Sequence, residues 1–371
     1  MRNYLAYTLF AIACFRAEGA PLPLEKRCLP GYARLGESAR YPLPRIEGQR
    51  AGIEIEGEIP RNISMTDVLA RITQELREIY PGDDLAALDH FAIRLRTRDG
   101  EIHAYQFVVD ASILPRGGMR GQELVSPILA TEKNLQMYAY VLSGLRRAGF
   151  RPTRNAGLHI HIDFPQPTVE EILRTADAFA RIENELMQVF RTAASRHAHI
   201  EPQSSQINRL LSRVRQGRIN PSEATIESII HELRDRERTL NFDSIIGPKG
   251  TLEFRLFNST VDEEAVFTML DFSLSFVRAT RDPHSRLSVL LSQRAHAPIS
   301  LQEVMTAIGA RPISPRVAEL LERELREDLQ SVPFSRAPDA RRARIARIVV
   351  GVALAGAAAY ATVQSLVNIS Q

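Results

Sequence analysis

The stretch GLHIHID at residues 157–163 decides the fold class of this chain. Apolar and polar residues alternate along it, and successive side chains of a β-strand point to opposite faces. One face would carry Leu158, Ile160 and Ile162. The opposite face would carry His159, His161 and Asp163. The stretch therefore predicts a strand with one face on a core. Its polar face is either a ligand surface or the solvated side of a sheet.

Three further stretches repeat this alternation: GIEIEGE (52–58), GQELVSP (121–127) and TLEFRLF (251–257). Each sets aliphatic or aromatic side chains against charged ones on the opposite face of a strand. The charged positions are Glu54, Glu56 and Glu58 in the first stretch, Glu123 in the second, and Glu253 and Arg255 in the third. The sequence thus places carboxylate, imidazole and guanidinium groups on the polar faces of four strands.

The residue types on these faces indicate a cation site. A solvated sheet face usually mixes Thr, Ser, Lys and Gln, whereas Glu and His recur here. Carboxylate oxygens and imidazole nitrogens are the ligands of Mg²⁺, Mn²⁺ or Zn²⁺. Carboxylates that converge without a cation repel one another and raise each other's pKa values. Taken together, the four strands predict a divalent-cation site, although each motif alone is also compatible with a solvated strand.

The remaining periodicity predicts an α+β domain with a mixed, mainly antiparallel sheet flanked by helices. Alternation on both sides of Asp99-Gly100 predicts a hairpin over 90–109. A second strand pair is expected from NFDSII (241–246) and 251–257 around Gly247-Pro248-Lys249-Gly250. Helices are expected over 64–79, 132–148, 168–190, 223–239 and 262–281, with two more within 300–328.

Length and composition fit one large folded domain between irregular ends. The chain has 371 residues, of which 44% are hydrophobic and 25% charged, as in ordinary globular proteins. We expect an irregular lead-in over 20–48, a catalytic domain over 49–330 and a basic linker over 331–347. Cys14 and Cys28 both precede that domain, so they offer neither a disulfide framework nor a zinc knuckle.

Charge argues against a nucleic-acid-binding protein. The formal net charge is only +3, and no basic stripe with interleaved aromatic residues occurs. Arginine supplies nearly all of the positive charge, because Lys26, Lys133 and Lys249 are the only lysines. We therefore expect no nucleic-acid partner.

The two ends of the chain raise a membrane question. Residues 1–19 combine an early arginine with a short apolar run, which is typical of a signal-peptide core. Residues 348–367 are uncharged and about long enough to cross a bilayer, or to form a buried helix. Arg341, Arg342, Arg344 and Arg347 precede them, and the positive-inside rule places such residues in the cytoplasm. We expect a membrane-anchored protein with a cytoplasmic catalytic domain; export through an N-terminal signal is the alternative.

In their order and combination, the motifs resemble those of the amidoligase family, carboxylate–amine ligases related to glutamine synthetase and glutamate–cysteine ligase. The resemblance covers residues 50–280 and rests on GIEIEGE, DAS (110–112) with GQELVSPIL (121–129), GLHIHIDF (157–164), Ser195-Arg196 and GTLEFRLFNST (250–260). It implies a glutamine-synthetase-like catalytic domain that uses ATP to join a carboxylate to an amine through an acyl phosphate. The substrates would be small molecules or peptides, and a homo-oligomer is compatible with the resemblance.

The resemblance also implies roles for single residues. Glu54, Glu56 and Glu123 would hold Mg²⁺ or Mn²⁺, and His159 and Glu253 would share a second metal ion. His161 would ligate metal or contact substrate. Arg255 would meet phosphate oxygens of ATP, with Arg196 as a second candidate for that work. Asp163 or Asp110 would take the proton from the attacking amine, or serve a structural purpose.

Two other functions fit parts of the sequence. HIHID resembles the HxHxD strands of metal-dependent hydrolases, but the metallo-β-lactamase type would carry a further histidine where Phe164 stands. The second alternative is a membrane-tethered binding domain that has kept the fold and lost the activity. The Glu, His and Arg positions are all present, so the sequence favours the ligase.

Overall fold

The computed structural model describes residues 43–330, apart from 80–83, 90–91, 97–101, 110–112, 114–116, 154–155, 191, 193–199, 235–236, 295–296 and 298. The expectations for residues 1–19, 331–347 and 348–367, including the C-terminal hydrophobic helix, fall outside this part of the chain and stay predictions. Among the helices that are described, none combines the length and apolar character needed to cross a membrane.

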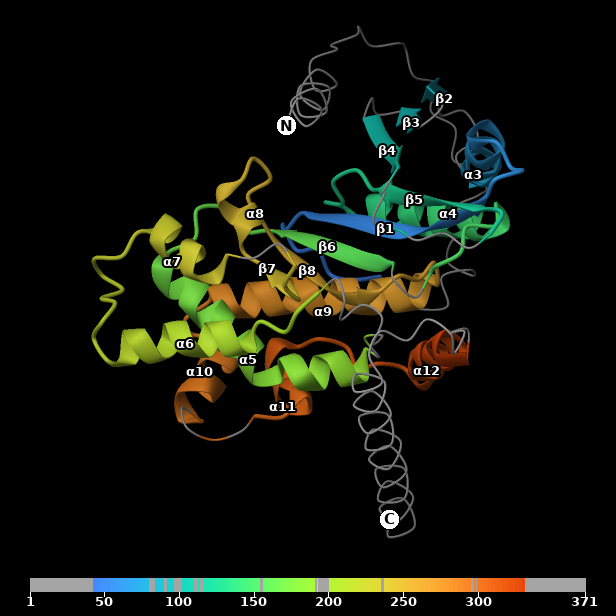
Figure 1. Ribbon diagram of the computed structural model, residues 1–371. Coiled ribbons are helices and arrows are strands. Elements are labelled where there is room, and N and C mark those ends of the chain that lie inside the picture. The colour runs from blue at the N-terminus through green and yellow to red at the C-terminus, as the bar shows by residue number, and fades with distance from the viewer. Residues whose placement is uncertain are drawn as a thin grey trace, which may run out of the picture.

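Eight strands form one sheet at the centre of the fold (Figure 1). Their spatial order is β2-β3-β4-β5-β1-β6-β8-β7, and every pairing between these strands is antiparallel. The prediction of a mainly antiparallel sheet is thereby confirmed. The strands are β1 (Ala51–Pro60), β2 (Asp84–Asp89), β3 (Ala92–Arg96), β4 (Ile102–Val108), β5 (Met119–Val125), β6 (Gly157–Asp163), β7 (Leu240–Asn241) and β8 (Thr251–Asn258).

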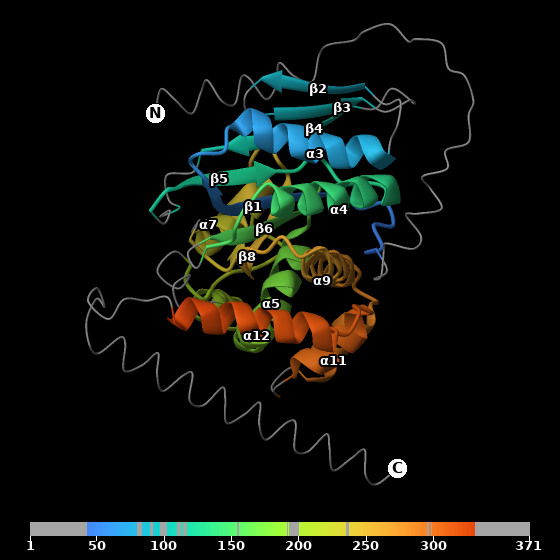
Figure 2. The same cartoon turned by 90° about the vertical axis from the view of Figure 1, so that its right-hand side faces the viewer.

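Helices cover one face of this sheet. In Figure 2, α3, α4 and α9 stand in front of it, and α11 and α12 lie below α9. The α+β prediction with flanking helices is confirmed for the described residues. The helices are α3 (Met65–Ile79), α4 (Glu132–Arg147), α5 (Val169–Val189), α6 (Ser204–Arg215), α7 (Ile226–Leu233), α8 (Asp243–Ile246), α9 (Glu263–Arg281), α10 (Arg286–Gln293), α11 (Leu301–Ile308) and α12 (Pro315–Gln330).

The alternation along the strands sets which face is apolar. Ile55 of β1, Ile160 of β6 and Phe254 of β8 are completely buried. The Phe254 ring meets Phe179 of α5 and Phe276 of α9 at centroid distances of 6.4 and 6.0 Å. Burying side chains of this size supplies most of the stabilisation of the fold. The polar residues of the same strands are thereby forced to the face away from α9.

Local capping begins the helices that the sequence predicts. Thr131 caps α4, Thr168 caps α5 and Asp262 caps α9, each accepting a backbone N–H of the first turn. The Ser64 hydroxyl likewise accepts the Asp67 N–H at 3.0 Å before α3. These caps satisfy N–H groups that have no partner inside the helix.

The segment 241–246 differs from the expected strand. Pairing with β8 ends after Asn241, and a short helix, α8, follows. The Asn241 side-chain oxygen accepts the Asp243 N–H at 2.9 Å, and the helical backbone angles of Phe242 turn the chain. A local side-chain bond of this kind competes with the sheet ladder for the backbone. The segment NFDSII is therefore a two-residue strand followed by a short helix, with Phe242 and Ile245 buried, and not one long strand.

Candidate active site

Register between the central strands brings the predicted site residues together. In the antiparallel pairing of β1 with β6, Glu54 lies opposite His159. In the pairing of β6 with β8, His161 lies opposite Glu253. Residues that face each other across antiparallel strands have neighbouring side chains on one side of the sheet. The motifs of three strands therefore form one continuous polar patch on the face away from α9.

A β-bulge shapes this patch at β8. Between the pairs Leu158–Phe257 and Ile160–Phe254, two residues of β8, Arg255 and Leu256, oppose His159 alone. An extra residue of this kind bends the strand and changes the direction of the neighbouring side chains. The bulge lets Leu256 and Phe257 both be buried, although they are adjacent in the chain.

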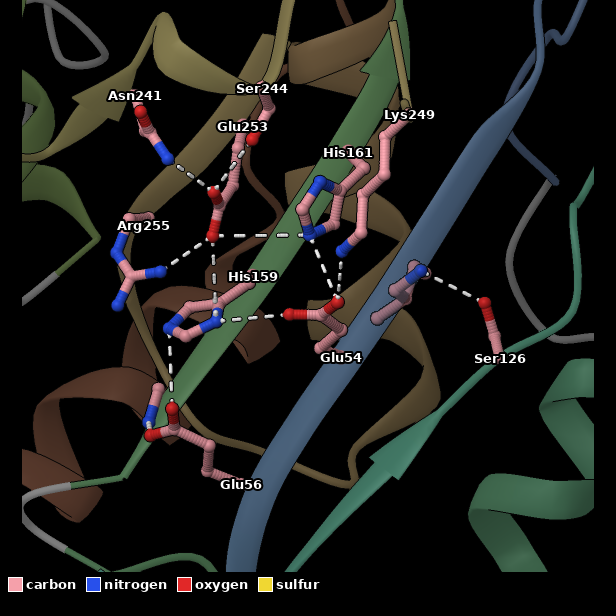
Figure 3. A network of polar contacts seen from close by, with 12 residues as sticks. Glu54, Glu56, Ser126, His159, His161, Asn241, Ser244, Lys249, Glu253 and Arg255 are labelled. Atoms are coloured by element: carbon pink, nitrogen blue, oxygen red, sulfur yellow. Dashed lines mark hydrogen bonds and ion pairs between the residues drawn. The ribbon is translucent and has the colours of Figure 1, made fainter. Parts of the chain in front are cut away.

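Glu253 is the most heavily contacted carboxylate of the patch (Figure 3). Its Oε2 accepts hydrogen bonds from Asn241 Nδ2 at 2.7 Å and Ser244 Oγ at 3.4 Å. Its Oε1 accepts from Arg255 Nη1 at 2.6 Å. The same Oε1 lies 3.7 Å from His159 Nδ1. Glu253 is thus held in one orientation by donors from β7, α8 and β8.

Glu54 lies between the two histidines and a lysine. Its Oε1 is 3.2 Å from His161 Nε2 and 2.9 Å from Lys249 Nζ. Its Oε2 is 3.4 Å from His159 Nδ1. Figure 3 shows Lys249 reaching from the segment before β8 towards this carboxylate. Glu54 of β1 therefore contacts side chains from β6 and from the loop between α8 and β8.

Two groups of side chains have the geometry of cation sites. Ligand atoms of Glu54, His161 and Glu253 all lie within 4.8 Å of one another, and so do those of Glu54, Glu123 and His159. Glu54 belongs to both groups. These two groups place Glu253 with His161 and His159 with Glu123, whereas the family resemblance implies that His159 and Glu253 share a metal ion. His161 lies opposite Glu253 in the register, but Glu253 Oε1 is 3.7 Å from His159 Nδ1 and 3.9 Å from His161 Nε2, so the pairing of His159 with Glu253 stays a prediction.

Glu56 lies beside these two groups and is in neither of them. Its Oε2 accepts the Gly157 N–H at 2.6 Å, and its Oε1 lies 3.4 Å from His159 Nε2. Thr251 contacts the other histidine, with its hydroxyl 3.3 Å from His161 Nδ1. A partner on the second ring nitrogen fixes the tautomer and the orientation of a metal-binding histidine. Glu56 and Thr251 can therefore orient the two imidazole rings.

Asp163 lies apart from the clustered ligands. Asp163 is at the end of β6, where its carboxylate forms an ion pair with Arg50. It belongs to neither cation group. Arg196 and Asp110 fall outside the described residues, so their predicted roles stay predictions.

Electrostatics keep the two central carboxylates ionised. Burial alone would raise the pKa of Glu253, but the charges of His161, His159 and Arg255 lower it to about 2, against the opposing charge of Glu54. Burial likewise opposes ionisation of Glu54. Hydrogen bonds from His159 and His161, with the charges of His161 and Lys249, nevertheless hold its pKa well below the usual value. Ionised carboxylates are the form that binds a cation.

Sequence reasoning missed four residues of this site: Asn241, Ser244, Lys249 and Thr251. Asn241 lies opposite Glu253 in the β7–β8 pairing, which a correct register would have revealed. Lys249 carried a signal of its own, because it is one of only three lysines and stands in the turn just before a motif strand. Ser244 and Thr251 gave no signal that distinguishes them from other hydroxyl residues.

A separate cavity of about 270 Å³ lies on the helical side of the molecule. It is lined by Arg45, Glu47, Asp271, Ser275, Arg278, Ile308, Gly309 and Arg311. Its charged groups bond to one another, as in the contact of Arg278 Nη1 with Glu47 Oε2 at 2.5 Å. None of the clustered carboxylates or histidines lines this cavity.

The α+β fold thus gathers carboxylates, imidazoles and an arginine on one sheet face. A family model described as "Putative amidoligase enzyme" matches residues 47–277, which is more than half of the chain. The chain therefore belongs to this amidoligase family. The resemblance seen in the motifs is thereby confirmed.

Other comparisons add little to the family match. The search of curated proteins found no match. Among solved structures, the crystal structure of the complex between the prokaryotic ubiquitin-like protein Pup and its ligase PafA is similar at 10% identity and a TM-score of 0.27. The similarity covers 78% of this chain and 66% of that one, just under two thirds of its length. A likeness this weak supports no conclusion about substrate.

Proposed function

We propose that this protein is a glutamine-synthetase-like ligase that uses ATP to activate a carboxylate as an acyl phosphate and then joins it to an amine. Mg²⁺ or Mn²⁺ would bind at the two ligand groups that share Glu54. The observation that supports the proposal most directly is the gathering of Glu54, His161 and Glu253 beside Arg255 on one sheet face. The two substrates are a carboxylate and an amine, free or within a peptide.

The donor set fits a divalent cation. Carboxylate oxygens with one imidazole per group suit Mg²⁺ or Mn²⁺. The buried Nε2 atom of His161 faces carboxylate oxygens of Glu54 and Glu253, which lie 3.2 and 3.9 Å away. A cation between these three atoms would satisfy the nitrogen and offset the repulsion between the carboxylates. When bound, such cations neutralise the negative charge of the nucleotide phosphates.

Residues of the chain can support both chemical steps. In the first step, a carboxylate oxygen of the substrate bonds to the γ-phosphorus of ATP, and the bond to ADP breaks. In the second step, the amine nitrogen attacks the acyl carbon, phosphate leaves, and the amine loses a proton. Arg255 has a planar fork suited to phosphoryl oxygens, and Glu253 fixes that fork through Nη1. Arg255 would thus stabilise the negative charge that is transferred.

The second step also needs an acceptor for the amine proton. Asp163 is the described carboxylate at the end of the site strand, and Arg50 engages it. A role as base would require this ion pair to open when the amine binds. Asp163 therefore enters the proposal as a candidate whose substitution is decisive.

The hydrolase alternative has less support from the site. Asp163, the third residue of the HxHxD pattern, lies in neither cation group and is paired with Arg50. Membership of an amidoligase family favours bond formation over hydrolysis. The family match also favours an enzyme over a binding domain without activity.

Isotope transfer tests the proposal directly. Protein would be incubated with ATP, Mg²⁺ and panels of ¹⁸O-labelled carboxylates and amines, and the released phosphate analysed by mass spectrometry. An acyl-phosphate route moves one ¹⁸O from the carboxylate to phosphate, with equal amounts of ADP and amide formed. Amide formation with unlabelled phosphate would contradict the acyl-phosphate step, and failure to bind ATP at millimolar Mg²⁺ would contradict the function.

Two variants separate the site from the fold in this assay. His159→Ala removes a clustered imidazole and is expected to abolish ADP release. Glu170→Gln changes an exposed carboxylate in the first turn of α5, on the helical side, and is expected to retain full activity. Full activity in His159→Ala would place the chemistry elsewhere.

A further inference from the structure

Lys249 contacts the carboxylate that both cation groups share. Its Nζ lies 2.9 Å from Glu54 Oε1, and the same oxygen lies 3.2 Å from His161 Nε2. The ammonium therefore sits at an oxygen that would have to bind a divalent ion. A lysine ammonium and a divalent cation compete for such an oxygen because both are positively charged.

The lysine side chain is free to leave this position. It is 56% exposed, whereas the Glu54 side chain is 15% exposed. A lysine makes a single-point contact from a flexible four-carbon stem, unlike the bidentate fork of an arginine. Arginine otherwise supplies nearly all of the positive charge of this chain, with three lysines among 47 basic residues. Position 249 thus carries a lysine, which exchanges its ion-pair partner more readily than an arginine does.

The backbone under Lys249 is anchored. The Gly250 N–H donates to the Gly247 carbonyl at 3.2 Å, and the Gly250 carbonyl accepts the Phe164 N–H at 2.9 Å. Gly250 has φ of +61°, a conformation that glycine adopts without strain. The turn therefore holds the Lys249 Cα next to the site while the side chain can move.

We propose that Lys249 is an exchangeable counter-ion of Glu54. It pairs with Glu54 when no divalent ion is bound, and it moves to phosphoryl oxygens of the nucleotide when the ion takes the carboxylate. This inference rests on the proposed function, since it needs both a cation and ATP at this site. Lys249 would couple the two binding events, because the ion releases the ammonium that then holds the nucleotide.

Opposite effects on two affinities test the inference. Lys249→Met keeps the length of the side chain and removes its charge. Mn²⁺ binding in the absence of nucleotide, followed by electron paramagnetic resonance, should tighten by roughly three- to tenfold, because the competing charge is lost. Binding of a non-hydrolysable ATP analogue with Mg²⁺, followed by calorimetry, should weaken by a similar factor, because a phosphate contact is lost.

Two controls complete the experiment. Lys133→Met, in the first turn of α4 on the helical side, should leave both affinities at the wild-type value. Lys249→Arg keeps the charge, and its guanidinium can form a bidentate pair with the Glu54 carboxylate. The Mn²⁺ affinity of this variant should therefore fall below that of the wild type.

The outcomes separate this inference from the proposed function. If wild-type protein binds neither Mn²⁺ nor nucleotide, both are overturned. If the wild type binds both ligands but Lys249→Met has unchanged or weaker Mn²⁺ affinity, the counter-ion inference alone is overturned. Tighter Mn²⁺ binding with unchanged nucleotide affinity also overturns it, because the proposed second partner is then absent.

Discussion

Two buried glutamates of this protein have opposite surroundings. Glu183, in the helical layer, is fully buried and accepts the backbone N–H groups of Gln203 and Ser204 at 2.7 Å each. It also accepts the Thr239 hydroxyl. Glu253, on the sheet face, is nearly as buried, but it contacts two imidazoles and a guanidinium. The negative charge of Glu54 also acts on it.

The difference teaches how to separate structural from functional carboxylates. Neutral donors hold Glu183. Two of them, the backbone N–H groups of Gln203 and Ser204, lie at the start of α6, whose N-cap residue Gln203 makes no side-chain capping bond. The neighbours of Glu54 and Glu253 are ionisable groups that a cation or phosphate could replace. A carboxylate whose hydrogen-bonding capacity is filled by neutral donors supports the fold. A carboxylate whose neighbours are charged side chains that a ligand could replace can bind ligands.

The largest expected effect concerns Glu54, the carboxylate that both cation groups share. Glu54→Gln should lower ligase turnover by about 10³-fold, because a missing charge-stabilising group costs on the order of 4 kcal/mol in the transition state. Divalent ions should raise the melting temperature of the wild type and leave that of the variant unchanged, since only a folded protein that binds the ion is stabilised. An undiminished metal effect in Glu54→Gln would place the ion elsewhere.

The next effect concerns pH and Glu253 in metal-free protein. The pKa of Glu253 falls from 4.5 to about 2 on folding. The ionised form therefore stabilises the fold at every pH above 4.5, and this stabilisation is lost as the pH falls from 4.5 towards 2. The shift corresponds to roughly 3 kcal/mol at neutral pH.

Glu253→Gln offers the matched measurement, because glutamine resembles the protonated side chain. Urea unfolding should show wild type more stable than the variant at pH 7 and at pH 5. The two free energies of unfolding should converge as the pH approaches 2. A constant difference over that range would show that the carboxylate is not ionised by its neighbours.

Glu183→Gln should show the opposite pattern to Glu54→Gln. One buried acceptor is lost from three donors, so the free energy of unfolding should fall by about 2 kcal/mol. Because Glu183 belongs to neither cation group, the rise in melting temperature on adding divalent ions should be retained. Loss of the metal effect in this variant would erase the distinction between the two glutamates.

The smallest effect is expected at Asp163. Its pair with Arg50 is partly exposed, so Asp163→Asn should change the free energy of unfolding by less than about 1 kcal/mol. Turnover should fall less than about tenfold while Arg50 occupies the carboxylate, whereas loss of a general base costs about 10²-fold or more. Steady-state rates over a range of pH would decide between these outcomes, and the larger loss would make Asp163 the base.

Local pattern was enough to predict the strands and most of the helices around the site. Alternation in GIEIEGE and GLHIHID predicts which face each side chain takes, because a strand repeats every two residues. Helix periodicity and caps such as Thr168 are also local features. By contrast, α6 was not predicted, since its first N–H groups depend on Glu183, 20 residues earlier in the chain.

The sequence by itself determined that Glu and His would share the polar faces of several strands in an amidoligase. Only the tertiary structure decided which residues meet: Glu253 with both histidines, His159 with Glu123, and Lys249 with Glu54. Side-chain alternation is a property of each strand alone. Register, the bulge at Arg255 and the position of a loop lysine depend on contacts between segments that are far apart in the chain.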